Sequence, residues 1–188
     1  MNLLKIVVSF FLSVFLFVGC KTNKSATSNE QSVNTRTEQK KKNFNERDFT
    51  EFNNYFFNAN KEKILGNFDA AYVLFAQCIR KDPTSDASYY AMAQVCVSLK
   101  KFEEALANIK QAVALNQKNK WYQALHADIL QKNKMYVEAA EVYENLVKNN
   151  PDAVEYYYEW AMALYVANKL PEAIKVYEKL ENKAGINP

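Results

Sequence analysis

Hydrophobic residues along this chain recur in four similar stretches. The first three are GNFDAAYVLFAQCIRKDP at 66–83, KKFEEALANIKQAVALNQ at 100–117 and KMYVEAAEVYENLVKNNP at 134–151, and the fourth, KLPEAIKVYEKLENKAG, begins at Lys169. Within each stretch the apolar residues are spaced three or four apart, which predicts an amphipathic helix. A single core helix has no reason to be copied, so the recurrence predicts a stack of similar supersecondary units.

The repeat is regular when units are aligned from Phe52, Asp86, Lys120 and Val154, each 34 residues after the last. Alanine occupies the eighth and the twentieth place of every unit. These alanines are Ala59, Ala93, Ala127 and Ala161, followed by Ala71, Ala105, Ala139 and Ala173. Because the side chains at a helix crossing set the separation of the two helices, the alanines predict close crossings. Large residues at the seventeenth and twenty-fourth places are expected to fill the space around those crossings.

Each unit is expected to contain two antiparallel helices. The chain has only 3 glycines and 4 prolines, too few for the many tight turns of a strand-rich fold. Gly66 and Asn133 lie in links between helices, where residues that tolerate the left-handed conformation are common. The expected helices cover residues 48–65, 68–81, 86–98, 102–115, 120–132, 136–149, 154–167 and 170–182. The sequence therefore predicts an all-α fold.

The 34-residue period, and the residue types that recur at fixed places within it (the columns of the aligned units), resemble the tetratricopeptide repeat. The resemblance extends from about Phe52 to Gly185. The resemblance implies a right-handed α-solenoid of four helix-turn-helix units at about 52–85, 86–119, 120–153 and 154–187, in a domain at 47–188. Two columns depart from the family pattern. Its tryptophan at the fourth place is replaced by Tyr55, Tyr89, Gln123 and Tyr157, and its leucine at the seventh by Asn58, Met92, His126 and Trp160.

The resemblance also implies a concave groove lined by the first helix of each unit. The residues that it directs into this groove are Phe56, Asn60, Tyr90, Gln94, Trp121, Asp128, Tyr158 and Met162, together with Gln131, Lys132 and Tyr165. Aromatic residues of this kind anchor protein interfaces, so the groove is expected to bind a peptide or a protein. The alternative is that Phe56, Tyr90 and Tyr158 only pack against neighbouring helices. The basic clamp that some family members use for a C-terminal carboxylate is excluded, because only Asn60 matches it.

The first residues have the pattern of a secretory signal. Lys5 precedes an apolar run from Ile6 to Val18, which is shorter than the about 20 residues needed to span a bilayer. Leu16-Phe17-Val18-Gly19-Cys20 resembles the lipobox of bacterial lipoproteins. This resemblance implies removal of residues 1–19 and attachment of acyl chains, such as palmitate, to Cys20. The alternative is an ordinary secretory signal in which Cys20 has no role.

Residues 20–46 are expected to form a disordered tether behind the lipidated cysteine. Polar residues dominate this segment, which therefore cannot bury enough apolar surface to offset the entropy of ordering. Several acyl chains on Cys20 would hold the protein at a membrane. By resemblance to the sorting of such lipoproteins, the absence of an acidic residue in the Lys-Thr-Asn-Lys that follows Cys20 favours the periplasmic face of the outer membrane.

Other chemistry has little support in the sequence. The net charge of +3 is too small to indicate a nucleic-acid partner. The one histidine, His126, has no accompanying catalytic pattern, and metal-ligand spacings and Gly-rich phosphate loops are absent. Neither an enzyme nor a cofactor or metal site is therefore expected. Cys78 and Cys96 lie on elements that should be adjacent, and they form either a disulfide or two buried thiols.

Two functions follow from these patterns. The first is a membrane-anchored, periplasm-facing scaffold or adaptor that binds a partner in the groove. The second is a structural or truncated module of a larger envelope complex, which stacks on a partner or a second copy through its last helix. That helix is expected to expose Ala173, Ile174, Tyr177 and Leu180, whereas a solenoid normally ends in a polar capping surface.

Overall fold

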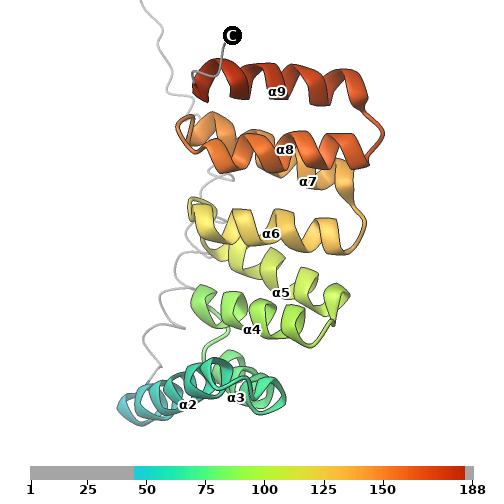
Figure 1. Cartoon of the computed structure of the whole chain (residues 1–188). Helices are drawn as coiled ribbons and strands as arrows, with labels where there is room; N and C mark the ends of the chain where they lie inside the picture. The colour runs from blue at the N-terminus through green and yellow to red at the C-terminus, as the bar shows by residue number, and fades with distance from the viewer. Residues whose placement is uncertain (1–44, 185–188) are drawn as a thin grey trace, which may run out of the picture. The chain divides into compact units, whose positions relative to one another are not determined.

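The structure is a computed structural model that describes residues 45–184, which form eight α-helices and no strand (Figure 1). The helices are α2 (Glu46–Ile64), α3 (Phe68–Lys81), α4 (Asp86–Ser98), α5 (Phe102–Leu115), α6 (Lys120–Lys132), α7 (Tyr136–Asn149), α8 (Val154–Val166) and α9 (Leu170–Ala184). Each helix packs chiefly against its neighbours in the sequence. The predicted all-α solenoid is confirmed.

The predicted helix bounds agree with the structure to within two residues. α2 begins at Glu46 rather than at residue 48, because Asn45 caps it: the Oδ1 atom of Asn45 accepts a hydrogen bond from the backbone N–H of Asp48 at 2.8 Å. α8 ends at Val166, one residue earlier than expected, and α9 continues to Ala184, two residues further. The strong helical periodicity therefore located every helix, and the differences are confined to end turns.

One residue in each link between the two helices of a unit adopts the left-handed conformation. These residues are Gly66, Lys100, Lys134 and Asn168, with φ values of 80°, 58°, 62° and 61°. The expectation that Asn133 would have this role is wrong, since its φ is −85°. Its side-chain Nδ2 atom instead donates a hydrogen bond to the carbonyl oxygen of Phe102 at 2.9 Å. All four units thus reverse direction at the same place of the repeat.

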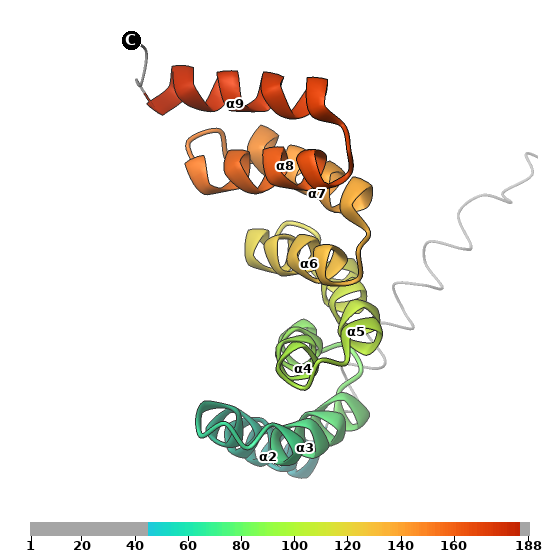
Figure 2. The ribbon, with the colours of Figure 1, turned by 45° about the vertical axis from the view of Figure 1, so that its right-hand side comes forward.

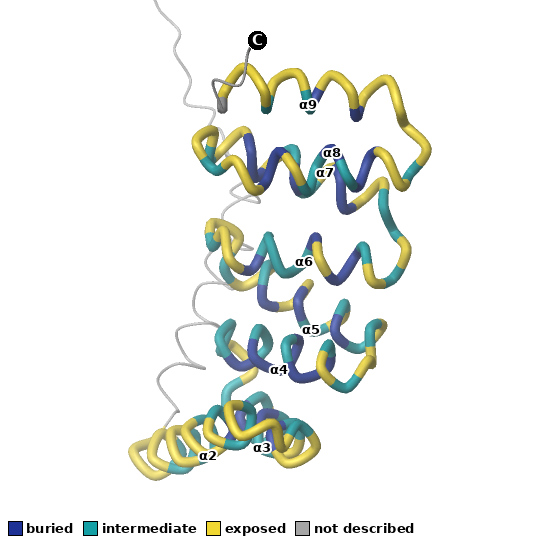
Figure 3. Tube along the Cα trace, in the orientation of Figure 1, coloured by how far each residue is buried: buried dark blue, intermediate teal, exposed yellow. Residues whose placement is uncertain are grey.

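The alanine columns are buried in the core, as expected for residues at close helix crossings. Seven of the eight alanines have no exposed surface, and Ala173 is 2% exposed. The buried residues form two core clusters, a first one that includes Phe75 and Ile109 and a second one that includes Tyr143. Leu106 packs against both clusters. Figure 3 shows that the buried positions alternate with exposed ones along each helix, as expected for a stack of amphipathic helices.

The last helix exposes less apolar surface than the sequence suggested. The expected exposure of Ala173 is wrong, because this residue belongs to the alanine column and faces the core cluster that α8 shares. Tyr177 and Leu180 are half-buried against the same cluster, and Ile174 is 56% exposed. Ile174, together with Leu170, which is 47% exposed, is therefore the apolar surface that α9 leaves open.

Cys78 and Cys96 are free thiols in the structure, and both are buried in the first core cluster. Burial disfavours the charged thiolate, so the pKa of Cys78 rises to about 11 and that of Cys96 to about 12. Thiols of this kind pack as small apolar side chains and react slowly with oxidants.

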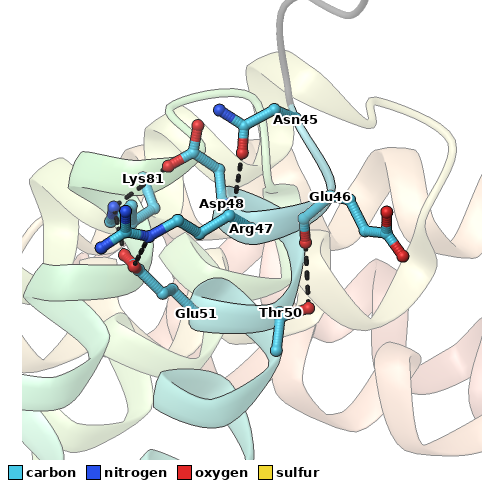
Figure 4. Close-up of polar contacts among 7 residues, drawn as sticks. All are labelled: Asn45, Glu46, Arg47, Asp48, Thr50, Glu51 and Lys81. Carbon is cyan, nitrogen blue, oxygen red and sulfur yellow. Dashed lines mark hydrogen bonds and ion pairs between the residues drawn. The ribbon is translucent and has the colours of Figure 1, made fainter.

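The first turn of α2 is held on the end of α3 by a group of ion pairs (Figure 4). The Nζ atom of Lys81 lies 2.5 Å from Oε2 of Glu51 and 3.2 Å from Oδ1 of Asp48. Glu51 also accepts a hydrogen bond from Nε of Arg47 at 3.0 Å. The hydrogen bond to Lys81, followed by that to Arg47, lowers the pKa of Glu51. These pairs join the first two turns of α2 to the last turn of α3.

The expected signal peptide, the lipidation site at Cys20 and the tether as far as Phe44 lie outside the described residues. A compact unit begins at Asn45, close to the expected start of the repeat domain. Between residues 45 and 184, no helix has the length and apolar character that crossing a membrane requires.

Candidate functional site

The candidate site is the surface formed by the first helices α2, α4, α6 and α8, which we call the first-helix face. Figure 2 shows the stack of helix pairs bending, with α4 and α6 on the inner side of the bend and α5 on the outer side. The residues predicted for the site lie two on each of these helices. They are Phe56 and Asn60 on α2, Tyr90 and Gln94 on α4, Trp121 and Asp128 on α6, and Tyr158 and Met162 on α8.

Three of the aromatic side chains that the sequence assigned to the groove are more than half exposed, and on α2 Phe49 and Phe57, which it did not assign there, are 56% and 71% exposed. Trp121 is 62% exposed, Tyr158 51% and Tyr165 57%. The Nζ atom of Lys120 lies 5.1 Å from the centroid of the Trp121 ring, so this ring already receives one cation on part of its surface. Met162, on the same helix as the two tyrosines, is half-buried. α6 and α8 therefore present aromatic surface that no other part of the described chain covers fully.

Phe56 and Tyr90, by contrast, pack within the repeat. The ring of Phe56 stacks on Phe52 at a centroid distance of 5.8 Å and meets Phe75 edge-on at 5.9 Å. Tyr90 stacks on Tyr122 at 4.7 Å. Burial raises the pKa of the Tyr90 hydroxyl, although a hydrogen bond with Gln94 opposes this effect. For these two residues the structure matches the alternative of packing against neighbouring helices.

Two of the predicted amides, Asn60 and Gln94, are already engaged by neighbouring groups. The Nδ2 atom of Asn60 donates to the carbonyl oxygen of Phe56 at 2.9 Å, within α2. The Oε1 atom of Gln94 accepts from the Nζ atom of Lys63 at 2.9 Å, and this bond joins the first and second units. Burial lowers the pKa of Lys63. Asn60 and Gln94 thus stabilise the face, and a ligand would have to compete with these bonds.

Asp128 belongs to a hydrogen-bonded group that links the second core cluster to the first-helix face. The hydroxyl of Tyr143 donates to Oδ1 of Asp128 at 2.5 Å. The Nε2 atom of Gln131 donates to the Tyr143 hydroxyl oxygen at 3.3 Å and to Oε2 of Glu159 at 3.4 Å. Burial, followed by the bond to Asp128, raises the pKa of Tyr143 far above its usual range. The group therefore connects α6, α7 and α8.

Sequence reasoning placed Tyr143 among the packing residues and missed its bond to Asp128. The signal was present in the repeat column, where Tyr143 replaces Phe75 and Ile109 of the earlier units. A buried tyrosine carries a hydroxyl that usually finds a partner, so the change from Phe to Tyr indicates a polar neighbour. Identifying that neighbour required the fold, because Asp128 lies on the preceding helix.

His126 is half-buried in α6, at the place where the family usually has leucine. Its Nε2 atom is buried and makes no hydrogen bond among the described residues. Burial lowers the pKa of this histidine, and the nearby charge of Lys110 lowers it further. Across the described chain, histidine, cysteine and acidic side chains do not gather in groups of three that could hold a metal ion.

Comparisons with known proteins agree with this architecture. Two family models, both described as tetratricopeptide repeat, match residues 64–129 and 124–186. Together they extend from the end of α2 into α9, so this chain contains tetratricopeptide repeats from residue 64 to residue 186. A search of curated proteins finds no match.

Solved structures show the same fold at low sequence identity. MamA from Desulfovibrio magneticus is 18% identical, with a TM-score of 0.65, and the match covers 71% of this chain and 75% of that one. YrrB, described as a tetratricopeptide repeat protein with an unusual peptide-binding site, is 19% identical, with a TM-score of 0.61 and coverage of 69% and 66%. The second such domain of human RPAP3, in complex with an HSP70 peptide, is 16% identical, with a TM-score of 0.57 and coverage of 62% and 97%.

Proposed function

We propose that this chain is a membrane-anchored, periplasm-facing scaffold that binds a peptide or protein segment on its first-helix face. Tetratricopeptide repeat proteins generally mediate protein–protein interactions, and two of the similar structures are described with a peptide-binding site or a bound peptide. The repeat therefore indicates protein binding as the class of function. The exposed residues of this chain indicate which part of its surface binds the partner.

The exposed aromatic rings of α6 and α8 carry the proposal. Trp121, Tyr158 and Tyr165 each leave more than half of their surface in contact with water. Aromatic side chains of this kind dominate the energetics of protein interfaces when a partner covers them. Asp128 and Gln131 lie on α6 with Trp121, and their polar side chains offer hydrogen-bonding atoms to a peptide backbone. The binding surface thus belongs mainly to the third and fourth units.

Photoreactive residues on the first-helix face test this proposal in intact cells. Substitution of Trp121 or Tyr158 by a photoreactive residue is expected to give adducts with one defined envelope protein after illumination. Val73 is the matched control, because it is an apolar residue that is 57% exposed on a second helix, α3. Equal adduct yields at Val73 and at the two aromatic positions would contradict a specific site on the first-helix face.

The membrane anchor is a separate part of the proposal and rests on the residues around Cys20. A thioether and amide-linked set of acyl chains would hold the repeat domain at the periplasmic face of the outer membrane, with residues 21–44 between lipid and fold. Growth with labelled palmitate is expected to label the wild-type chain and leave Cys20→Ala unlabelled and released from the membrane fraction. A labelled Cys20→Ala chain would refute lipidation at this residue, whatever the first-helix face binds.

The second candidate function is stacking through the last helix. Ile174 supports it, since this residue is 56% exposed at the repeat place where Ala140 of the preceding unit is 3% exposed. If the last helix stacks on a second copy, the molar mass measured by light scattering would rise with protein concentration. The substitution Ile174→Glu would then lower the measured molar mass to that of a single chain. A wild-type chain that stays monomeric at all concentrations would leave the first-helix face as the sole candidate.

A further inference from the structure

The second helices α3, α5, α7 and α9 follow one another on the other side of the stack. We call the region between two successive second helices a step, and the three steps are filled by different side chains. At the step from α3 to α5, the side chain of Tyr72 bridges the gap. Its hydroxyl donates a hydrogen bond to Glu104, and the Nζ atom of Lys101 lies 4.2 Å from the centre of its ring. The bond to Glu104, followed by burial, raises the pKa of Tyr72 to about 12. A tyrosine of the chain itself thus closes this step.

In the first three units the same repeat place holds progressively smaller residues. Tyr72 of α3 corresponds to Leu106 of α5 and to Ala140 of α7, each 34 residues on. Leu106 packs against both core clusters and so closes the second step. Ala140 has only a methyl group, which is 3% exposed. The step from α7 to α9 therefore lacks the side chain that fills the two earlier steps.

A cavity of about 410 Å³ opens at this third step, which we call the α7–α9 groove. Such a volume lies in the range of sites that enclose small ligands or single side chains. Its lining includes Ala140, Trp160, Leu164, Lys169, Glu172 and Val176. Trp160 occupies the place of Met92, which is 4% exposed in the second unit, and the Nζ atom of Lys179 lies 5.4 Å from its ring centroid.

The two residues that hold Tyr72 at the first step are retained at the third. Lys169 and Glu172 occupy the same repeat places as Lys101 and Glu104, two periods later. Both line the groove, both are exposed, and neither side chain forms an ion pair among the described residues. The groove therefore keeps the cation and the acceptor of a tyrosine site, and adds an aromatic ring, while the tyrosine itself is missing.

From this comparison we propose that the α7–α9 groove is a docking site for a tyrosine side chain of a partner protein. The partner's ring lies against Trp160 and Leu164 with Lys169 over its face, and its hydroxyl donates a hydrogen bond to Glu172. Tyr72, held by Lys101 and Glu104, is the template for this geometry within the same chain. The groove is lined mainly by residues of α7 and α9, with Trp160 and Leu164 from α8, and it contains none of the residues assigned to the first-helix face above.

Titration of the full-length protein with p-cresol, the side-chain analogue of tyrosine, tests the site. Indole N–H resonances report each tryptophan separately, and the chain has two, Trp160 in the groove and Trp121 on the first-helix face. We expect p-cresol to shift the Trp160 signal saturably, with a dissociation constant on the order of millimolar, while Trp121 stays unchanged. Toluene, which lacks the hydroxyl, is expected to bind about 2- to 10-fold more weakly.

Variants of the groove decide whether the phenol is recognised as proposed. Glu172→Ala is expected to lower the affinity for p-cresol to that for toluene, and Glu178→Ala, an exposed change on α9 outside the lining, leaves both unchanged. Ala140→Tyr is expected to abolish the Trp160 shift, because the introduced ring closes the step as Tyr72 does. Equal affinities for p-cresol and toluene, or equal shifts of the two indoles, would overturn the proposal. Glu172→Ala decides alone if Ala140→Tyr does not fold.

Discussion

The two core clusters occupy the same repeat places with different chemistry. At the twenty-fourth place the first cluster has Phe75 and Ile109, both without exposed surface and both wholly apolar. The second cluster has Tyr143, which is equally buried but sends its hydroxyl to Asp128 on the first-helix face. One place of the repeat can therefore serve packing alone, or it can connect the core to the surface that a partner would meet.

The surfaces above the two clusters differ in the same direction. Above the first cluster, Phe56 and Tyr90 turn their rings onto neighbouring aromatic side chains. Above the second, Tyr158 and Tyr165 remain more than half exposed. Of the aromatic residues assigned to the groove, those of the first two units thus serve mainly packing and those of the last two are available for binding, while Phe57 on α2, which was not assigned to the groove, is 71% exposed. Four predictions test this division, and they follow in order of expected effect.

Phe75→Ala is expected to have the largest effect on stability. Phe75 is fully buried in the first cluster, so removing its ring leaves a cavity that the fixed helix crossings cannot close. Such changes lower the free energy of unfolding by about 3–5 kcal/mol. Urea denaturation followed by circular dichroism measures it. A loss below about 1 kcal/mol would mean that the first cluster is not the tightly packed half.

Tyr143→Phe is expected to lower the free energy of unfolding by a smaller amount, about 1–2 kcal/mol, because it removes one hydrogen bond to a carboxylate and keeps the ring. The same denaturation experiment applies. Tyr158→Phe is the matched control, since its ring is 51% exposed and the change should leave stability unaltered. If the two substitutions have equal effects, the hydroxyl of Tyr143 does not connect core and surface as described.

His126 lies near the boundary of the two core clusters. It is expected to make the free energy of unfolding depend on pH. Burial keeps the folded-state pKa of His126 below its usual value of 6.5, so the unfolded chain binds the proton more readily. Stability is therefore complete above about pH 6.5 and decreases as the pH falls toward the lower folded-state pKa, by at most about 1.4 kcal/mol per pH unit.

Denaturation of wild-type and His126→Leu chains between pH 7 and pH 5 measures this contribution of the histidine. The leucine variant keeps an apolar side chain at this place and should lose part of the pH dependence. Identical slopes for the two chains would show that His126 takes up its proton equally well in the folded state.

The left-handed links give the smallest expected effect, with opposite signs in the two halves. Gly66 has a φ of 80° in the first unit, and Lys134 has a φ of 62° in the third. Lys134→Gly is expected to raise the free energy of unfolding by about 0.5–1 kcal/mol, because glycine adopts this conformation without steric conflict. Gly66→Ala should lower it by a similar amount. Thermal unfolding of both variants measures the two changes in the free energy of unfolding. A stabilising effect of Gly66→Ala would contradict the left-handed conformation assigned to Gly66.

The fold could be predicted almost completely from the sequence because it depends on local and repeated signals. Methyl-sized residues at the crossings and a regular apolar spacing determine where helices begin and how closely they pack. Ala173 shows the limit of this reasoning. Its place in the alanine column indicated burial, whereas its place on the last helix suggested exposure, and the structure agrees with the column.

The candidate site could be predicted only in part. The resemblance assigned residues to the first helices correctly, but it did not distinguish a ring that faces solvent from one that lies on a neighbour. That distinction depends on the side chains opposite: Tyr122 covers Tyr90, while Tyr158 stacks on no aromatic ring of the described residues and stays 51% exposed. The α7–α9 groove was missed for the same reason, since Ala140 becomes informative only when Tyr72 is seen to bridge its own step.

The arrangement in which each helix packs chiefly on its sequence neighbours has a consequence for local opening of the chain. Few contacts join distant units, so a terminal pair can detach while the remaining pairs stay folded. Amide protons of α2 and α9 should accordingly exchange faster with solvent than those of α5 and α6, in a graded profile rather than a single cooperative one. Binding at α6 or α8 would slow exchange there and reach the ends only weakly, so a partner could hold the middle of this chain while its outer helices continue to open and close.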